Sequence, residues 1–246
     1  MVNNYKADKE ERIYKIEGVG EFPSVTTVIA QLDKSGPLMG WSAKIVIEYL
    51  QAHQHDLANE PTETFKLAKQ YYKQLQEEAK DFGSELHNCL EVYLKTNKVN
   101  GLLEANPRLK TPLAEFIKWQ MANEFKLVEA EHIVWSEQYQ FAGTLDCVSE
   151  LKGKLYLVDF KSSKAIYDDY LMQIAAYMKA YEERTSKEIQ GLGILRLPKN
   201  ELDGYEWREW TLDEAKDAFD EFMCLVSFWH ERNRNKKKGG INVKSK

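Results

Sequence analysis

The chain has 246 residues, and its 43% hydrophobic and 12% aromatic content is ordinary for a globular protein with a large core. No segment resembles a signal peptide and no apolar run approaches the roughly 18 residues of a membrane helix, so we expect a soluble, cytoplasmic protein without a membrane partner. The formal net charge of −5 argues against loose electrostatic coating of nucleic acid and favours a local basic groove.

The N-terminal third is predicted to hold one strand followed by helices. The strand is expected over Ile13–Val19, leading to Pro23, and Ser24 or Thr26 can then cap a short helix. Gly83 is expected to interrupt the helical pattern that follows. The helices expected from this point of the chain onward run over residues 37–53, 61–80, 84–95 and 113–125.

The remainder of the chain alternates strands and helices. Thr211, with Glu214 three residues later, is a capping-box pattern for the last helix. This order of elements predicts an α/β fold with a twisted mixed sheet flanked by helices on both faces. The order is a helix, three strands, a helix and then further strands. The expected strands are Leu127–Glu137, Phe141–Leu151, Lys154–Lys161, Gly191–Leu197 and Tyr205–Trp210, and the expected helices are Asp168–Arg184 and Leu212–Arg232.

Two aspartates end short apolar runs, Asp146 in TLD and Asp159 in LYLVD. Gly153 marks a turn between the runs, so the segment predicts a β-hairpin that brings the two acids close together. Side chains alternate faces along a strand, so Lys161 points to the same side as Asp159.

An aspartate at a strand end often only caps the next turn, and the spacing D-x-K is common by chance. Two unpaired carboxylates held together are costly, however, unless a metal ion or a proton compensates. Carboxylates hold hard divalent cations, and a neighbouring ammonium can position a water or offset developing phosphate charge. The pattern therefore indicates a hydrolytic centre.

The motifs G-T-x-D, D-x-K and Q-x-x-x-Y, in this order, resemble the PD-(D/E)XK nuclease superfamily in its RecB-like exonuclease branch, which includes phage exonucleases. Gly83 and His87 supply the G-x-x-x-H setting that this branch carries on an upstream helix. The resemblance spans about residues 83 to 197, and it implies a restriction-endonuclease-like core with a helical N-terminal elaboration.

The resemblance also implies roles for particular residues. Lys161 matches the catalytic lysine, and Gln173 and Tyr177 match a helix motif that lies beside the site and touches the substrate. One or two Mg²⁺ or Mn²⁺ ions are implied, and a histidine ligand favours Mn²⁺ somewhat. The residues that match metal ligands are His87, Asp146, Asp159 and, through its backbone carbonyl, Phe160.

Five further residues are candidates for supporting roles. Glu91 lies four residues after His87 and so on the same helical face, where it could orient the imidazole, bind metal, or simply be an exposed helix residue. Glu137 ends the strand before the G-T-x-D strand, where related nucleases often place an acid. Ser162, Ser163 and Lys164 follow the D-x-K motif and could contact a substrate phosphate. Lys164 could equally be a solvated loop lysine.

The cysteines set a further expectation. Several members of this branch hold an iron–sulfur cluster with four cysteines, but this chain has only Cys89, Cys147 and Cys224, without a C-x-x-C pair. Three thiolates cannot supply four ligands, so no iron–sulfur cluster is expected. Few unpaired cysteines also suit a reducing compartment.

We therefore expect a metal-dependent deoxyribonuclease that digests DNA from its ends, single-stranded or double-stranded, in recombination, repair or phage DNA processing. A recombination protein or a single-strand-binding protein is a candidate partner. Two alternatives stay open, a structure-specific endonuclease and a nucleic-acid-binding adaptor whose site has decayed. The sequence leaves polarity, strand preference and oligomeric state undetermined.

The chain is expected to divide into an N-terminal strand and helical elaboration (residues 1–82), a nuclease core (83–232) that forms one compact domain with it, and a basic tail (233–246). The elaboration could form one wall of a DNA channel or serve only in packing. Residues 231–246 contain seven basic residues and one acidic residue, a net charge of +6 that leaves −11 for the rest of the chain. The tail could follow the DNA backbone or be merely a solvated end.

Overall fold

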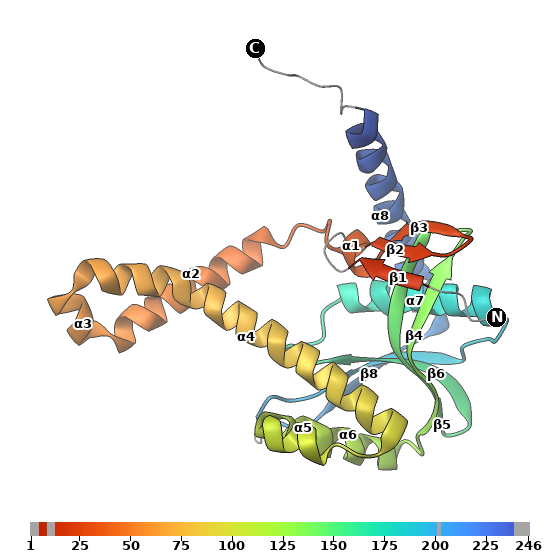
Figure 1. Ribbon diagram of the computed structural model, residues 1–246, viewed down its shortest axis with the longest axis horizontal. Coiled ribbons are helices and arrows are strands. Elements are labelled where there is room, and N and C mark those ends of the chain that lie inside the picture. Colours follow the sequence, from red (N-terminus) through yellow and green to blue (C-terminus); the bar gives the residue numbers. More distant parts are fainter. Residues whose placement is uncertain (1–4, 9–12, 201–202, 239–246) are drawn as a thin grey trace. The chain divides into compact units, whose positions relative to one another are not determined.

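A computed structural model describes residues 5–8, 13–200 and 203–238 (Figure 1). The chain divides into two compact units, one of Met1–Gln31 with His87–Lys246 and one of Leu32–Leu86. These units do not follow the predicted segments, because the N-terminal 31 residues group with the sheet rather than with the helical elaboration. None of the helices in the described part of the chain is both long and apolar enough to cross a membrane.

The larger unit is built on a five-stranded sheet in the order β4-β5-β6-β7-β8. The β6–β7 pair is parallel and the other neighbouring pairs are antiparallel, so the predicted mixed sheet is confirmed. Each strand was predicted to within about one residue at its ends. The strands are β4 (Lys126–Ser136), β5 (Phe141–Leu151), β6 (Lys154–Lys161), β7 (Gly191–Arg196) and β8 (Glu206–Trp210).

The hairpin of β5 and β6 is closed by a two-residue turn. Lys152 and Gly153 both have positive φ, 48° and 80°, which is the backbone of the type I′ turn that matches strand twist. Leu151 pairs with Lys154, and the register continues to Cys147 opposite Val158. The predicted turn at Gly153 therefore sets which residues of the two strands face each other.

Helices flank the sheet on both faces (Figure 1). On one face α7 (Asp169–Thr185) packs across β4, β5, β6 and β7, and α1 (Val25–Ile29) and α8 (Leu212–Lys238) pack against α7. On the other face α6 (Lys110–Ala122) packs Phe116 edge-on against Phe160, with ring centroids 5.4 Å apart. The fully buried aromatic and aliphatic side chains between these layers form the core.

The predicted strand Ile13–Val19 is instead part of a small three-stranded antiparallel sheet. The chain reverses after β2 because Gly18 takes a φ of 75°, which side chains disfavour. The side chain of Ser24 then accepts a hydrogen bond from the Thr27 N–H and caps α1, as predicted. The strands are β1 (Tyr5–Asp8), β2 (Ile13–Ile16) and β3 (Gly20–Pro23).

The prediction that Gly83 interrupts a helix is wrong. One helix, α4, runs without a break through Pro61–Thr96. A single glycine inside a helix costs only about 1 kcal/mol relative to alanine, and the many good helix formers on either side of it exceed that cost. His87 therefore lies well inside a long helix and not near the start of a short one.

Short helices and one helix end were not predicted. The capping box of Thr211 and Glu214 is confirmed, with both reciprocal hydrogen bonds formed, but α8 extends six residues past the predicted end at Arg232.

In the unit of Leu32–Leu86, α2 packs Trp41 and Tyr49 against the aromatic side chains of α4. The remaining elements are α2 (Ser35–Ala52), α3 (Gln54–Asn59), α5 (Asn100–Ala105) and the 3₁₀ helix η1 (Pro107–Leu109).

Candidate active site

The register of β5 and β6 brings two carboxylates together. Because Cys147 pairs with Val158, the next residues along the hairpin, Asp146 and Asp159, lie opposite each other. Both are buried, with 8% and 1% of their surface exposed. The backbone N–H of Phe160 donates to Asp146 Oδ2 at 2.7 Å, which fixes the orientation of that carboxylate.

His87 of α4 reaches the same point from outside the sheet. Its Nδ1 lies 3.3 Å from Asp146 Oδ1. The negative charge of Asp146 raises the pKa of His87 to about 9 against the opposing effect of burial. Burial acts to raise the pKa of Asp146, but the neighbouring imidazole and Lys161 outweigh it and lower that pKa.

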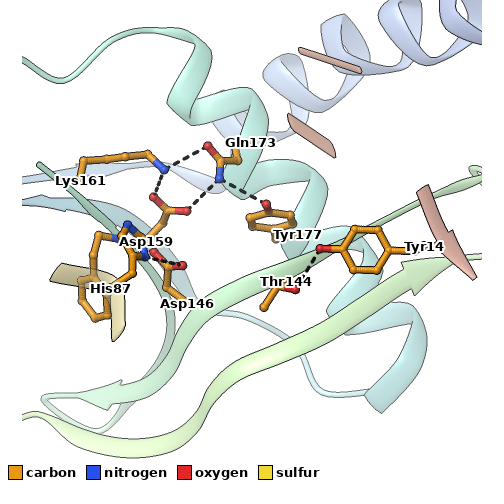
Figure 2. A network of polar contacts seen from close by, with 9 residues as sticks. Tyr14, His87, Thr144, Asp146, Asp159, Lys161, Gln173 and Tyr177 are labelled. Carbon is orange, nitrogen blue, oxygen red and sulfur yellow. Dashed lines mark hydrogen bonds and ion pairs between the residues drawn. The ribbon is translucent and has the colours of Figure 1, made fainter. Parts of the chain in front are cut away.

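Lys161 and Gln173 complete a polar network around Asp159 (Figure 2). Lys161 Nζ lies 2.5 Å from Asp159 Oδ2 and donates to Gln173 Oε1 at 3.1 Å. The Gln173 amide donates to Asp159 Oδ1 at 3.1 Å and to the Tyr177 hydroxyl at 3.3 Å. One turn of α7 thus holds both the carboxylate and the amine of the D-x-K motif.

The glycine of the G-T-L-D run has a packing role. A Cβ at Gly143 would lie 2.4 Å from Cε1 of Tyr177, well inside van der Waals contact. The Tyr177 ring therefore lies directly on the β5 backbone, and this close approach sets the distance of α7 from the acids. No side chain larger than hydrogen can occupy position 143 without moving Tyr177.

Two buried carboxylates share the site with the Lys161 ammonium and the His87 imidazole. Burial, reinforced by the nearby Asp146 and opposed by Lys161, raises the pKa of Asp159 to about 6. Asp159 Oδ2 has the Lys161 ammonium as its partner, with no further hydrogen bond to it among the described residues. A bound cation would lower the free energy of two carboxylates held this close together.

The structure adds Glu131, which the sequence analysis missed. In β4, Ala130 pairs with Cys147 and His132 with Leu145, so Glu131 lies opposite Asp146. Possible ligand atoms of His87, Glu131 and Asp146 all lie within 4.8 Å of one another. Burial, followed by the charge of Asp146, raises the pKa of Glu131 to about 7.

The backbone at Glu131 is strained. Its φ is 49°, inside a strand and in a region that non-glycine residues seldom adopt. Such strain costs on the order of 1–3 kcal/mol and is found preferentially at functional sites. The unusual backbone lies at the residue whose carboxylate comes within reach of His87 and Asp146.

The structure does not bring Glu137 to the site. Glu137 follows β4 at the end distant from Asp146, and its carboxylate pairs with Arg184 at 2.9 Å. The acid of this strand that joins the site is Glu131, six residues earlier. Glu91 lies close enough to Glu131 to act on its pKa, but its own carboxylate pairs with Lys95 at 2.6 Å.

The segment after Lys161 offers less than was predicted. Ser163 Oγ donates to the Ala165 carbonyl at 2.8 Å, so its hydroxyl is used within the loop. Ser162 is half-buried and Lys164 is exposed. Only Lys164 of these three presents a fully solvent-accessible side chain.

A second unpredicted contact comes from the N-terminal sheet. Tyr14 of β2 shares a 3.0 Å hydrogen bond with Thr144 Oγ1 (Figure 2). Thr144 lies two residues before Asp146 and therefore on the same face of β5. The contact spans 130 residues of sequence, which no local pattern could indicate.

The chain matches the family model of the PD-(D/E)XK nuclease superfamily over residues 60–223, more than half of its length. The chain therefore belongs to the PD-(D/E)XK nuclease superfamily, which confirms the resemblance at the level of the superfamily and the restriction-endonuclease-like fold. A search of curated proteins found no match.

Two solved structures are similar in part. One, named "Putative exonuclease", from Eubacterium rectale, shares 14% identity with a TM-score of 0.44, covering 64% of this chain and 68% of that one. The other, named SSO0001, shares 15% identity with a TM-score of 0.30, covering 58% of this chain and 71% of that one.

Nucleases of this superfamily use divalent metal ions, and the donor set here fits one. Carboxylate oxygens are the ligands that Mg²⁺ and Mn²⁺ prefer, and an imidazole nitrogen is accepted by Mn²⁺. His87, Glu131 and Asp146 supply such atoms within 4.8 Å of one another, and Asp159 lies opposite Asp146 on the neighbouring strand.

Proposed function

We propose that the protein is a metal-dependent exonuclease that hydrolyses phosphodiester bonds from DNA ends. The observation that carries the proposal is the convergence of Asp146, Asp159, Lys161 and His87 from two strands and a helix. The superfamily supports a nuclease, and the residues around the acids support a cation-assisted reaction.

The proposed metal ligands come from β5, β6 and α4. Asp146, Asp159 and His87, with the Phe160 carbonyl, would hold Mg²⁺ or Mn²⁺, in one or two sites. A divalent ion bound there would polarise the phosphate and lower the pKa of a water molecule. The Asp146 carboxylate is already oriented for this role by the Phe160 N–H.

Lys161 is the proposed catalytic lysine, which assists the attack of water on the phosphorus atom. Its amine is fixed between Asp159 and Gln173, and the negative charge of the two acids raises its pKa against the effect of burial, so it stays an ammonium. A positioned ammonium can orient the attacking water and offset charge on the pentacovalent phosphate. Gln173 accepts a hydrogen bond from this amine, and the Tyr177 hydroxyl accepts one from Gln173.

The finer assignment to end-dependent digestion depends on the RecB-like elements. These are His87 on the helix before the sheet and the pair Gln173 and Tyr177 on α7, whose side chains all lie in one network. We place the reaction in recombination, repair or phage DNA processing, with DNA as substrate and a recombination or single-strand-binding protein as candidate partner. The three cysteines lie on different elements, α4, β5 and α8, which supports a site without an iron–sulfur cluster.

The test is digestion of end-labelled single-stranded and double-stranded DNA with Mn²⁺, beside closed circular DNA of the same sequence. We expect mononucleotides or short products from labelled ends, no nicking of the closed circle, and loss of all activity in EDTA. Nicking of the closed circle would replace the exonuclease with a structure-specific endonuclease. Binding without any cleavage in Mg²⁺ or Mn²⁺ would leave only the adaptor.

A further inference from the structure

The loop between Lys161 and α7 carries an exposed aromatic ring that the proposed chemistry does not use. Tyr167 is 49% exposed although it lies only six residues beyond the catalytic lysine. Its ring packs edge-on against Tyr170, with centroids 5.6 Å apart and an interplanar angle of 80°. One flank of the Tyr167 ring is thus supported and much of the rest faces solvent.

Tyr170 connects this ring to the site. Lys161 Nζ lies over the Tyr170 ring, 4.9 Å from its centroid, while the same amine pairs with Asp159. An ammonium at this distance is attracted by the electron-rich face of the ring. A single aromatic ring therefore separates Tyr167 from the amine that faces the scissile phosphate.

A purely structural role explains the backbone of Tyr167 but not its side chain. The Tyr167 carbonyl accepts the Tyr170 N–H at 3.1 Å and so helps to begin α7. Any residue supplies that carbonyl. A ring with about half of its surface in water adds little to the core, so its apolar face is available to a ligand.

An exposed aromatic ring beside a lysine suits the base and the phosphate of a polynucleotide. A nucleobase is flat and apolar on its faces, and stacking on an aromatic side chain contributes about 1–3 kcal/mol per base. Bases inside a duplex already stack on each other, so an unpaired base presents its faces to the protein more readily than a paired one. The exposed Lys164, in the same loop, supplies a positive charge for the adjoining phosphate.

The geometry points to Tyr167 as a substrate-binding residue that stacks on an unpaired base close to the scissile phosphate, with Tyr170 as the positioning residue that fixes both Tyr167 and Lys161. This inference rests on the proposed nuclease function and extends it. The site then takes a single-stranded end, and a duplex must open by at least one base pair before it is cut.

The experiment pairs a change in the protein with the matching change in the substrate. Tyr167→Ala, Tyr167→Leu and Tyr167→Phe are compared with the unchanged protein on single-stranded oligonucleotides that carry one abasic nucleotide, moved stepwise inward from the end. Affinity is measured in Ca²⁺ and kcat/KM in Mn²⁺. Phe228→Ala, which removes another exposed aromatic ring, is the matched control.

We expect one abasic position to weaken binding of the unchanged protein and of Tyr167→Phe by about 5-fold or more, the lower end of the stacking range. Tyr167→Ala and Tyr167→Leu should bind the intact oligonucleotide more weakly by the same factor and be insensitive to the abasic position. Leucine keeps apolar packing but not the flat face, so it separates stacking from loop stability. Phe228→Ala should behave as the unchanged protein.

Equal losses for Tyr167→Ala on intact and abasic oligonucleotides, at every position, would overturn the stacking role, as would no loss at all. The proposed function fails differently. If neither the unchanged protein nor Phe228→Ala cuts any DNA in Mn²⁺, the nuclease assignment is wrong, even where binding in Ca²⁺ still shows the matched abasic effect.

Discussion

Asp159 is the residue on which the proposed chemistry converges. It faces Asp146 across the hairpin, pairs with Lys161 and accepts from Gln173, and it is almost fully buried. Removing water from two neighbouring carboxylates raises the free energy of the site before any ligand binds. We therefore expect the two carboxylates to cost stability in the metal-free protein and to be stabilised when a cation binds.

Substituting either member of the D-x-K motif should stop the reaction. Asp159→Ala and Lys161→Ala are expected to lower kcat by about 10²-fold or more, because each removes a group that acts on the phosphate. DNA affinity measured in Ca²⁺ should change little. A purified, folded variant that retains full turnover on end-labelled DNA would remove that residue from the mechanism.

Glu131 should contribute to cation affinity. Glu131→Gln is expected to weaken Mn²⁺ binding, measured by titration calorimetry, by about 10- to 100-fold, the range found when groups around a metal site are lost. Glu137→Gln is the matched control, because it changes an acid of the same segment that pairs with Arg184 away from the site. Equal affinities of the two variants would exclude Glu131 from the cation site.

The stability of the metal-free protein should fall as the pH rises from 6 to 9. His87 has its pKa raised from 6.5 to about 9, so the stability it contributes is complete below pH 6.5 and lost as the pH passes 9. Glu131 has its pKa raised from 4.5 to about 7, so its contribution is lost as the pH passes 7. Both pKa shifts therefore lower the free energy of unfolding as the pH rises.

The measurement is Tm in EDTA and in excess Mn²⁺ at pH 6, 7.5 and 9. Cation binding displaces the protons, so the increase in Tm caused by Mn²⁺ should grow with pH. Glu131→Gln should flatten the EDTA series. A Tm in EDTA that rises steadily across this range would contradict the assigned shifts.

At the scale of elements, α7 and β5 are held at a fixed distance by Tyr177 and Gly143. Gln173 can bridge Asp159 and Lys161 only if α7 stays in this place, because its amide reaches the carboxylate with a 3.1 Å hydrogen bond. The helix and strand therefore position the catalytic groups through packing as much as through polar contacts.

Gly143→Ala tests this spacing. The added Cβ would meet Tyr177 Cε1 at 2.4 Å, and overpacking of this kind costs about 1–3 kcal/mol. We expect a lower Tm together with a lower kcat. In a Tyr177→Ala background the same change should cost much less, a non-additivity that identifies the contact. Additive losses in the double variant would show that the glycine serves some other purpose.

Local patterns explain which elements were predictable. The β5–β6 hairpin was predicted to the residue because its alternation and its Gly153 turn are both short-range signals. Glu131 was not, because β4 and the residue after it offer several acids, and the one that faces Asp146 depends on pairing with β5 and on a register shift between Leu127 and Glu129. Glu137, the acid proposed from the sequence, lies away from Asp146 and pairs with Arg184.

At the scale of the whole molecule, the N-terminal residues were the hardest to place. Their sequence showed a strand and a cap, but not that Tyr14 would bond to Thr144, since contacts across 130 residues leave no periodicity. Order and spacing alone predicted that Asp146, Asp159 and Lys161 lie together, and the structure places them side by side because their contacts are local. The positions of Tyr14 and Glu131 depend on long-range packing.

The basic C-terminal segment should govern the salt dependence of DNA binding. Three of its lysines end α8, and the residues beyond Lys238 lie outside the described part of the chain. Each phosphate contact contributes about −0.9 to the slope of log affinity against log salt on duplex DNA and about −0.7 on single strands. Replacing Lys236, Lys237, Lys238, Lys244 and Lys246 with glutamine should flatten that slope.

A loss of two contacts would change the slope by roughly 1.4 to 1.8, while cleavage at saturating DNA should hardly change. The matched control replaces three exposed lysines of α4 with glutamine, Lys66, Lys69 and Lys73, and is compared with a variant that changes only the three lysines at the end of α8. An unchanged slope for the C-terminal variant would mean that these charges are only solvated.

The two-residue turn at Lys152 and Gly153 has a consequence for the order of folding. A hairpin closed by so short a loop forms within about 1–10 μs, whereas His87 must arrive through a contact with Asp146 that is more distant in sequence. The nascent hairpin therefore brings Asp146 and Asp159 face to face before the imidazole is present. A cation supplied during refolding would relieve this early repulsion, so Mn²⁺ should speed the formation of the native state as well as stabilise it.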